Sequence, residues 1–540
     1  MMRDKESFVS IKSLMPHGQN DIVAAEIDDI VYHLEAEVDK NSTIKWIMLN
    51  SEAGVRIYER TLCLILFVAL AEAMPGTEIQ ILFSISNGFY CESLKGKEFS
   101  KDELNLIQRK MKEIIDENAY IQRHKVNRRE AIDYFQAKGR FGTVNLIKQQ
   151  MEDEVVLYSC NGVTEYIYDI VADYAGKARF FEIQPYLDGF LVRFPSIYPK
   201  EPTESGIPPF IPQDKLAKSF LEAESWADIL GCKFISDLNQ LNSSNQFDEL
   251  VQLSEAFHTR KLIYIADGIA EHRKEQRLIC IAGPSSSGKT TFAGRLRKYL
   301  QINRIHPVMI SVDDYFKNRE DTPKKPDGSY DFEHIETIDL ELFNEHLDQL
   351  LHGEEVEIPS FNFISGRREW AGHRVKVSEN EPIIIEGIHC LNEKLTHKVP
   401  RSEKIKIYIS ALTQLALDHH NRISTTETRL IRRLVRDFQF RGASAEQTLG
   451  MWRSIREGEE RFIFPFQEEA DVMFNSTLLY ELPILKRRAE PLLKSVPRES
   501  DFYGEAQKLL QFLSYFRAAD CKAIPEESLL KEFIGAKNSF

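Results

Sequence analysis

The chain has 540 residues, of which 43% are hydrophobic and 28% charged, a composition typical of globular proteins. A chain of this length has room for about three or four domains. Its net charge of −14 excludes a protein that coats nucleic acid along its whole surface, so RNA binding would depend on a local basic patch.

The cysteines and the apolar runs indicate where in the cell the protein is expected. Seven scattered cysteines form no CxxC pair, which gives no zinc signature and indicates reduced thiols in a cytoplasmic protein. The start of the chain, MMRDKESFVS, has no apolar segment of a secretion signal. The longest apolar run, Leu62 to Ala71, is shorter than the about 20 residues that span a bilayer. We therefore expect no membrane partner; association into a homo-oligomer stays open.

The pattern of the first half of the chain predicts small domains built of strands and helices. Short apolar runs alternate with turns over residues 20–60 (DIVAAEIDDIVYHL, STIKWIMLN, GVRIYE), which predicts a β-rich module. The run at 62–71 predicts a buried helix. A second helix is predicted from Lys101, because Ser100 and Glu103 have the spacing of a capping box. Mixed strands and helices follow to about residue 195, and six prolines in 195–212 predict a loop or domain boundary.

The pattern changes in the second half. Residues 246–272 predict a helix, and continuous apolar runs follow at 277–283, 306–312, 381–387 and 404–410. Such runs are typical of strands buried on both faces. Strands alternating with helices predict an α/β fold, a parallel sheet with helices on both faces. The residues after 477 look helical.

Residues 283–291 (GPSSSGKTT) match the phosphate-binding pattern G-x-x-x-x-G-K-[ST] between a predicted strand and a predicted helix. Its backbone N–H groups and the helix N-terminus favour phosphate oxygens. We expect Lys289 to reach the β- and γ-phosphates of ATP and Thr290 to bind Mg²⁺. The residues expected to hold the ATP phosphates are Gly283, Pro284, Ser285, Ser286, Ser287, Gly288, Lys289, Thr290 and Thr291.

Acidic and basic side chains follow at places suited to phosphoryl transfer. Asp313 and Asp314 come at the end of the second strand, where one could accept the proton of a substrate hydroxyl, unless the pair only caps a turn. Glu386 ends the third strand and faces either a metal or a polar network. Four arginines share one helix face, which favours phosphates over a merely solvated surface: Arg429, Arg432, Arg433 and Arg436.

Residues 278 to about 476 resemble the uridine kinase and phosphoribulokinase family of P-loop kinases. The motifs occur in the family order: GPSSSGKTT, SVDDYF, YDFEHIETID, IPSFNF, IIEGIH, TRLIRRLVRD and FPFQEEADVMFN. The resemblance implies that Asp313 is the catalytic base close to Mg²⁺, that Glu386 and Thr290 hold the metal, and that Glu333 binds ribose hydroxyls. It also implies lid arginines around the transferred phosphate: Arg432 and Arg433 on ATP, and Arg436 and Arg441 on the acceptor, with Arg436 and Lys289 catalytic.

The acceptor pocket departs from the family pattern. Members that phosphorylate pyrimidine nucleosides have a Tyr and a His where this chain has Phe361 and Gly366, and Glu333 replaces an Asp. These departures leave a pyrimidine preference open. The acceptor could be a purine, another nucleoside or a non-nucleoside alcohol.

Residues 20–175 resemble the N-terminal region of threonyl-tRNA synthetase, a β-grasp (TGS) module followed by an editing domain. The metal-binding HSxxH helix of that domain aligns with RTLCL (60–64), so Arg60 and Leu64 replace both histidines, and Cys160 has no His partner. Hydrolytic editing is not expected. The basic segment QRHKVNRR (122–129) is either a solvated helix entry or a contact for RNA.

The sequence thus predicts a fusion, resembling a bacterial group described as nucleoside kinases. The expected parts are a β-grasp domain (1–60), an editing-like α+β domain (61–212), a helical linker (213–272), the kinase domain (273–490) and a helical C-terminal segment (491–540). The leading hypothesis is an ATP-dependent kinase of a small hydroxyl compound, with the 5′-hydroxyl of a nucleoside as the first choice. The alternative is a nucleotide-dependent RNA-binding or regulatory protein.

Overall fold

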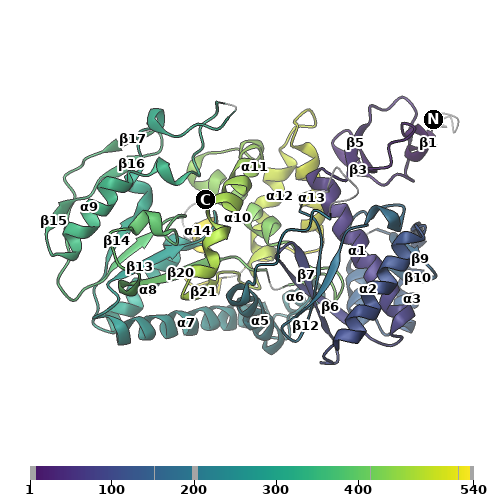
Figure 1. The fold of residues 1–540 in the computed structure, drawn as a ribbon, viewed down its shortest axis with the longest axis horizontal. Helices are drawn as coiled ribbons and strands as arrows, with labels where there is room; N and C mark the ends of the chain where they lie inside the picture. The colour runs from purple at the N-terminus through teal and green to yellow at the C-terminus, as the bar shows by residue number, and fades with distance from the viewer. Residues whose placement is uncertain are drawn as a thin grey trace.

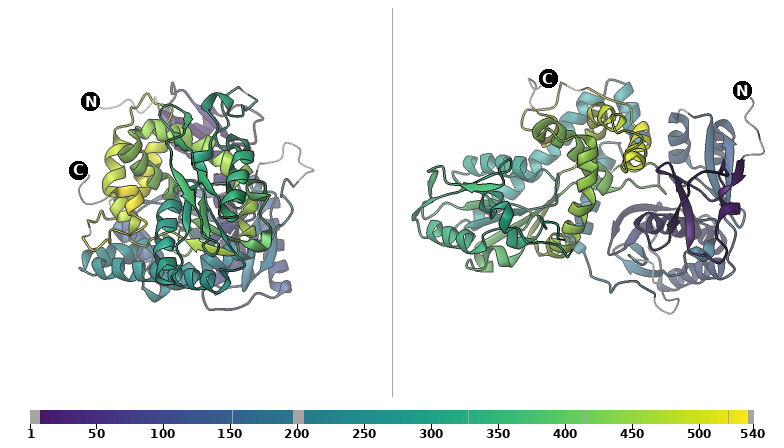
Figure 2. Two further views of the ribbon diagram at one scale, coloured as in Figure 1. Left: turned by 90° about the vertical axis from the view of Figure 1, so that its left-hand side faces the viewer. Right: turned by 90° about the horizontal axis from the view of Figure 1, so that it is seen from above.

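The fold comes from a computed structural model, which describes residues 8–150, 152–196, 205–326, 328–413, 415–520 and 522–535 (Figures 1 and 2). Part of the proline-rich segment 195–212 lies outside these residues, as does Cys521. The six cysteines within them are buried free thiols. Among the helices of the described ranges, none combines the length and apolarity needed to cross a bilayer.

A five-stranded parallel sheet forms the centre of the second half, with the order β14-β19-β13-β20-β21. Four of its strands match the continuous apolar runs, which confirms that prediction: β13 (Leu278–Ala282), β14 (Val308–Ser311), β19 (Ile383–Glu386) and β20 (Lys404–Ser410). The fifth strand is β21 (Val472–Asn475).

Helices cover both faces of this sheet, as predicted. Alternate residues of β13 point to opposite faces. Leu278 and Cys280 share a core with α5 (Asp214–Ile229) and α9 (Leu340–Leu351), whereas Ile279 and Ile281 share one with α7 (Phe247–His272) and α8 (Lys289–Ile302). The predicted helix at 246–272 is confirmed by α7, which runs along the lower edge of the view in Figure 1.

The other helices of this half flank the sheet beyond β20 and β21 (Figure 1). They are α10 (Thr425–Arg441), α11 (Ala445–Phe462), α12 (Glu481–Lys494), α13 (Tyr503–Ser514) and α14 (Lys531–Ile534). Two antiparallel strand pairs follow α9: β15 (Glu355–Glu357) with β18 (Arg374–Lys376), and between them in the chain the hairpin of β16 (Ser360–Asn362) with β17 (Arg367–Glu369). The expectation of helices after residue 477 is confirmed for α12 to α14.

The N-terminal module has two small sheets around its own core, which contains Ile11, Ile22 and Leu34. Its strands are β1 (Phe8–Ser10), β2 (Ile22–Ile27), β3 (Ile30–Tyr32), β4 (Glu37–Asp39) and β5 (Lys45–Met48). The run GVRIYE, predicted with these strands, lies instead in α1 (Glu52–Ala73). Ser51 starts this helix by accepting a hydrogen bond from the Gly54 N–H group at 3.0 Å.

Two further sheets follow. One has the order β11-β12-β7-β6 and the other β10-β9-β8. Their strands are β6 (Ile79–Ile85), β7 (Gly88–Ser93), β8 (Gln122–Asn127), β9 (Glu154–Cys160), β10 (Val163–Glu165), β11 (Glu182–Tyr186) and β12 (Gly189–Arg193). The helices are α2 (Lys101–Asp116), α3 (Arg128–Ala137), α4 (Phe141–Gln149) and α6 (Ile235–Ser243). The capping box that starts α2 is confirmed.

The basic segment 122–129 is not simply a helix entry, because most of it forms β8 before α3 begins at Arg128. Cross-strand pairing with β9 places Lys125 3.9 Å from the Glu154 carboxylate, and Arg128 lies 3.7 Å from Asp153. Acidic neighbours therefore partly offset the charge of this segment.

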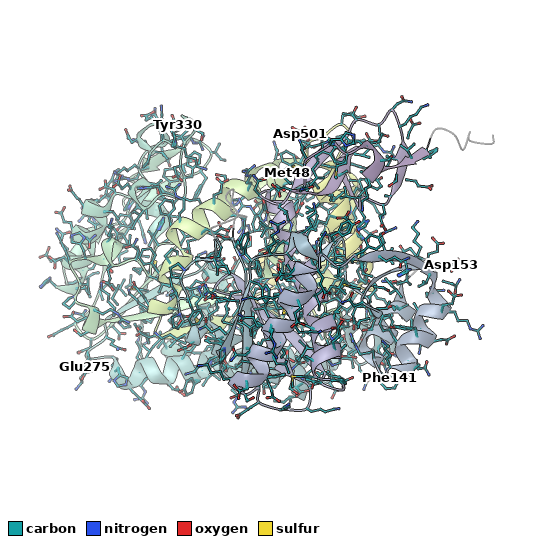
Figure 3. All side chains as sticks on the ribbon, turned by 45° about the vertical axis from the view of Figure 1, so that its right-hand side comes forward. Met48, Phe141, Asp153, Glu275, Tyr330 and Asp501 are labelled. Atoms are coloured by element: carbon teal, nitrogen blue, oxygen red, sulfur yellow. The ribbon has the colours of Figure 1, made fainter. Side chains whose placement is uncertain are left out.

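The two halves of the chain contact each other at several places. Phe83 of β6 stacks on Phe220 of α5 with ring centroids 4.7 Å apart, and Phe67 of α1 stacks on His420 at 3.6 Å. Helix α13 touches the N-terminal module, where the Gly504 backbone lies against Asp29; Figure 3 labels Asp501 and Met48 in this region. The helices α5 to α7 share their core with the five-stranded parallel sheet, and the predicted boundary at residues 60/61 falls inside α1.

Candidate active site

The phosphate loop lies between β13 and α8, where its backbone bends tightly. Gly288 caps α8 with a φ of +89°, and Ser286 has a φ of +59°, so successive N–H groups turn toward one side. A side chain at Gly283 would meet the Ile409 carbonyl oxygen of the neighbouring β20 at 2.0 Å. Glycine is therefore required at Gly283 because a side chain has no room there, and at Gly288 because its φ is positive.

Two side chains of the loop have partners that a nucleotide would replace. The Lys289 ammonium folds back and donates to the carbonyl oxygens of Gly283 at 3.0 Å and Pro284 at 3.2 Å. The Thr290 hydroxyl donates to the Glu386 carboxylate at 3.3 Å. Lys289 thus turns toward the loop backbone, and Thr290 turns toward the carboxylate at the end of β19.

Three strands end together beside this loop and bring the predicted carboxylates to it. Glu386 at the end of β19 is in register with Ile281 of β13 and Ser311 of β14, and Asp313 follows in the turn after β14. Burial and the nearby Asp313 raise the pKa of Glu386 to about 7. Burial also raises the pKa of Asp313, while the Lys289 ammonium opposes this rise.

These groups fit a magnesium ion that takes most of its ligands from phosphate and water. Mg²⁺ in such sites uses one or two protein carboxylates. Thr290, Glu386 and Asp313 supply a hydroxyl and two neighbouring carboxylates whose mutual repulsion a cation would relieve. In the described part of the chain, no cluster of three or more His, Cys, Asp or Glu could hold a metal.

Asp314 has different contacts from the adjacent Asp313. Its carboxylate accepts a hydrogen bond from the Phe361 N–H group at 3.3 Å and so fixes the start of the β16–β17 hairpin. Of the two aspartates left open by the sequence, Asp313 is the one whose charge interacts with Lys289.

The arginines of α10 have carboxylate partners, two of them on other helices. Arg429 pairs with Glu459 of α11, and Arg432 pairs with Glu481 of α12 at 2.5 Å. Arg433, Arg436 and Arg441 all approach Asp437, at 3.0, 2.8 and 3.6 Å. The four guanidinium groups therefore do not need phosphates for neutralisation, because distant acids supply the charge for Arg429 and Arg432 and Asp437 of the same helix supplies it for Arg433 and Arg436.

Three of these arginines also hold the phosphate loop. Arg429 donates to the Ser285 carbonyl oxygen at 3.1 Å, Arg432 to that of Ser286 at 3.4 Å, and Arg433 to the Ser285 hydroxyl at 2.6 Å. Arg436 and Arg441 pair with Asp437 rather than with the loop. The structure thus brings Arg432 and Arg433 to the predicted ATP site, while Arg441 is near enough to lower the pKa of Asp313.

Glu333 lies close to this group of charges. Burial and the nearby Glu459 raise its pKa to about 7, against the opposing charges of Arg433 and Lys289. Gly458 of α11 makes room for it, since a Cβ atom there would come within 2.4 Å of the Glu333 side chain. The sequence did not single out Gly458, because its effect depends on a residue more than a hundred positions away.

The β16–β17 hairpin carries the other predicted acceptor residue. Phe361 makes edge-to-face contacts with Phe316 and Phe363, with centroid distances of 5.5 and 5.2 Å. At the turn, a side chain on Gly366 would meet the Arg319 guanidinium at 2.9 Å. Arg319 also donates to the Phe363 carbonyl oxygen at 3.1 Å. It therefore fills the space beside Gly366, where the resemblance leads one to expect a His.

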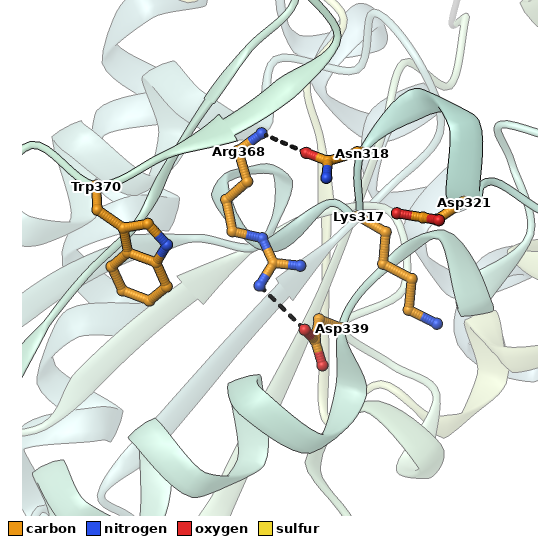
Figure 4. A pocket seen from close by; sticks show the side chains of 6 residues that line it. All are labelled: Lys317, Asn318, Asp321, Asp339, Arg368 and Trp370. Carbon is orange, nitrogen blue, oxygen red and sulfur yellow. Dashed lines mark hydrogen bonds and ion pairs between the residues drawn. The ribbon is translucent and has the colours of Figure 1, made fainter.

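A cavity of about 430 Å³ opens beside this hairpin (Figure 4). In Figure 4, Arg368 reaches across it to Asp339 at 3.0 Å, with Trp370 on one side and Lys317 on the other. None of the predicted site residues lines it. The cavity is therefore adjacent to the hairpin rather than part of the group around Lys289.

In the first half of the chain, the two positions where the resemblance leads one to expect histidines, Arg60 and Leu64, have structural roles. Arg60 pairs with Asp169 at 2.8 Å, and Leu64 is fully buried. Cys160 is buried as well, and burial raises its thiol pKa to about 11. On the same helix, Phe67 stacks on His420 of the second half of the chain, and Glu59 pairs with Arg422 at 2.7 Å.

The comparison with known proteins starts from the second half. Residues 278–480 match the family model "Phosphoribulokinase / Uridine kinase family". A uridine kinase from Borrelia garinii subsp. bavariensis is 30% identical over 229 residues, which cover 41% of this chain and 97% of the relative. A uridine kinase from Mycoplasma genitalium is 31% identical over 179 residues, covering 33% of this chain and 74% of the relative.

The first half matches another class of protein. A threonine–tRNA ligase from Ehrlichia chaffeensis is 31% identical over 156 residues, which cover 29% of this chain. This chain spans about a quarter of that ligase, 25% of its length. The family match supports a kinase-type phosphotransferase that binds a nucleotide. The chain belongs to the phosphoribulokinase/uridine kinase family, and in it a uridine kinase-like domain is fused to a synthetase-like N-terminal region.

Proposed function

We propose that the protein is an ATP-dependent phosphotransferase whose acceptor is the 5′-hydroxyl group of a nucleoside. The observation that carries the proposal is the meeting of Lys289, Thr290 and Glu386 with Asp313 at the carboxyl ends of β13, β14 and β19. Ligands of open α/β sheets bind at this edge. Phosphoryl transfer depends on positioning and charge stabilisation, which such a group provides.

In the proposed reaction, Asp313 accepts the proton of the acceptor hydroxyl as its oxygen attacks the γ-phosphorus atom. Burial raises the pKa of Asp313, which makes the carboxylate a better proton acceptor. Lys289 leaves the loop carbonyl oxygens and binds the β- and γ-phosphates, and Arg433 and Arg436 add positive charge around the group in transit. Mg²⁺ held by Thr290 and Glu386, with Asp313 close by, would supply charge neutralisation at the phosphates.

Glu333 is proposed to bind the ribose hydroxyl groups, and Phe361 to contact the base. Phe361 has no hydroxyl group, and its aromatic neighbours Phe316 and Phe363 offer only ring faces and edges. These contacts favour an aromatic acceptor without selecting a pyrimidine. Arg441 is proposed to lie at the acceptor side, because its charge reaches Asp313.

Release of ADP from purified protein tests the proposal. The protein is offered ATP, Mg²⁺ and a panel of purine nucleosides, pyrimidine nucleosides and sugars. We expect at least one nucleoside to stimulate ADP release above the acceptor-free rate. The proposal fails if no compound of the panel stimulates turnover at concentrations that saturate other family members.

The similarity of the first half to threonine–tRNA ligase favours a second candidate function, nucleotide-dependent RNA binding. The basic residues of β8 and the start of α3 would form the contact, although Glu154 and Asp153 offset part of their charge. Retention of tRNA at physiological salt would support it. An isotherm equal to that of an acidic control protein would dismiss it.

A further inference from the structure

The C-terminal strap, defined here as residues 526–535, is docked against the kinase half rather than trailing from it. Leu529, Leu530 and Phe533 are fully buried and belong to the same core as α10 and α12. The Ser528 hydroxyl lies 3.1 Å from the Tyr480 hydroxyl, and the Arg432 guanidinium lies over the Phe533 ring at 4.9 Å. Figure 1 shows α14, within the strap, beside α10.

The strap crosses the end of the phosphate loop. The Glu532 carboxylate accepts a hydrogen bond from the Thr291 N–H group at 3.2 Å. Leu529 lies 3.5 Å from where a Cβ atom of Gly288 would be, and Glu527 lies 3.7 Å from the Lys298 ammonium on α8. The segment therefore contacts both the start of α8 and a later turn of the same helix.

The Thr291 N–H group is one of those a bound phosphate would use. Helix α8 begins at Lys289, so Thr291 is its third residue, and the first N–H groups of a helix have no partner within it. In a phosphate loop these groups bind phosphate oxygens. Glu532 places a carboxylate, another anion, on this N–H group.

The charge of Glu532 also extends into the predicted metal and acceptor sites. It contributes to the raised pKa of Glu386, after burial and Asp313, and it acts on Arg441. Three phosphates brought to the loop would meet this negative charge at close range, in a partly desolvated place where repulsion is strong. A bound nucleotide and the docked Glu532 carboxylate would therefore oppose each other.

We propose that the C-terminal strap is an autoinhibitory element, in which Glu532 occupies a phosphate position at Thr291 and must leave before the donor nucleotide binds fully. The inference rests on the proposed function in one respect, that the nucleotide binds at this loop. It assigns a role to a segment in which the sequence showed no chemistry. Nucleotide binding and strap docking are then coupled, so each opposes the other by the same factor.

Binding of ATP, measured by equilibrium dialysis with the 540-residue chain, tests the proposal without any acceptor. We expect Glu532→Ala to lower the dissociation constant of ATP by about five-fold or more, the lower range of coupling between sites. Glu532→Gln, which keeps a hydrogen-bond acceptor but loses the charge, should fall between. The matched control is Glu526→Gln, since Glu526 is also in the strap but lies 3.7 Å from Lys531, away from the loop.

An equal or weaker affinity in Glu532→Ala overturns the strap proposal and leaves the phosphotransferase proposal intact. Absence of ATP binding in both the natural chain and the variant overturns both. A second measurement uses the natural chain alone, so it does not depend on how a variant folds. Hydrogen exchange of residues 526–535 should become faster when ATP is added, and unchanged or slower exchange contradicts release of the strap.

Discussion

Asp313 and Asp314 are neighbours in the chain but have different surroundings. Asp314 holds the Phe361 N–H group, whereas Asp313 interacts with Lys289 and Glu386. A sequence pattern cannot separate two identical adjacent residues, because the difference arises from the segments that approach them. The structure makes a distinct prediction for each.

Asp313→Asn should lower kcat by about 10²–10⁴-fold, the range lost with a general base, while the affinity for ATP changes little. The matched control is Asp314→Asn, in which the amide oxygen can still accept from the Phe361 N–H group. Steady-state kinetics of the acceptor-stimulated reaction measure both. Equal losses in the two variants would show that Asp313 has no special role.

Gly458→Ala should raise the KM for the acceptor more than it changes kcat. The added methyl group would come within 2.4 Å of Glu333, so the carboxylate proposed to bind ribose has to move. Gly294→Ala on α8 is the control, because its methyl group meets nothing within 4 Å. An unchanged acceptor KM in Gly458→Ala would remove Glu333 from the acceptor site.

The phosphate loop was predictable at this scale because all its groups lie within nine residues of sequence. The partners of the arginines were not, since Glu459 and Glu481 come from other helices. Arg319, Gly458 and Glu532 were missed for the same reason. The role of each of these residues depends on a contact with a segment that is distant in sequence.

At the scale of elements, α10 is held from two sides by buried ion pairs. Arg429 connects it to α11, and Arg432 connects it to α12. Because both arginines also donate to the loop carbonyl oxygens, the position of α10 determines the shape of the loop. The neighbouring helices thus contribute to the site without contributing a reacting group.

Glu481→Ala should lower the free energy of unfolding by about 3–5 kcal/mol, since it leaves the Arg432 guanidinium buried without its counter-charge. The double variant Arg432→Met/Glu481→Met should lose less than Glu481→Ala, because it leaves no charge unpaired. Urea unfolding of the three proteins compares them. A double variant less stable than Glu481→Ala would contradict this account of the pair.

The strands of the kinase sheet were predictable because strands buried on both faces need continuous apolar residues, and β13, β14, β19 and β20 have them. Helix α1 was only half predicted. Its first residues, which include Val55, Ile57 and Tyr58, resemble a strand in isolation. The cap at Ser51 and the core around the helix decide in favour of the helix.

At the scale of the whole molecule, α7 leads into β13, the central strand of the five-stranded sheet. Its His258 is buried, with Nε2 3.1 Å from the Thr477 carbonyl oxygen and its ring against Phe474. Burial, with a smaller effect of Arg295, lowers the pKa of His258 to about 3. The folded protein therefore keeps this side chain neutral under mildly acidic conditions.

His258 should make the protein less stable as the pH falls. An unfolded His takes up a proton near pH 6.5, and the folded state does not until about pH 3, so stability is lost on acidification below about 6.5. Between pH 6.5 and 5 the loss is about 2 kcal/mol. His258→Gln should reduce the difference in melting temperature between pH 7.5 and about pH 5, and the exposed His17→Gln should leave it unchanged. A full difference in His258→Gln would contradict the neutral buried state.

Segments near the C-terminus contact both the N-terminal module and the phosphate loop. Helix α13 touches the N-terminal module, and the strap follows it to the phosphate loop. The loop at 418–422 contacts α1 and leads directly into α10. The synthetase-like half therefore reaches the elements that shape the site, a relation that no local sequence pattern could reveal.

Transfer of the γ-phosphoryl group from radiolabelled ATP to a nucleoside tests the central claim most directly. In the presence of Mg²⁺, we expect the label to appear in a nucleoside 5′-monophosphate for at least one acceptor. Lys289→Ala should slow this transfer by about 10²–10³-fold, while Arg297→Ala, an exposed residue of the same helix, should not. The claim is contradicted if the label appears only in ATP and inorganic phosphate for every acceptor, or if Lys289→Ala transfers it at the natural rate.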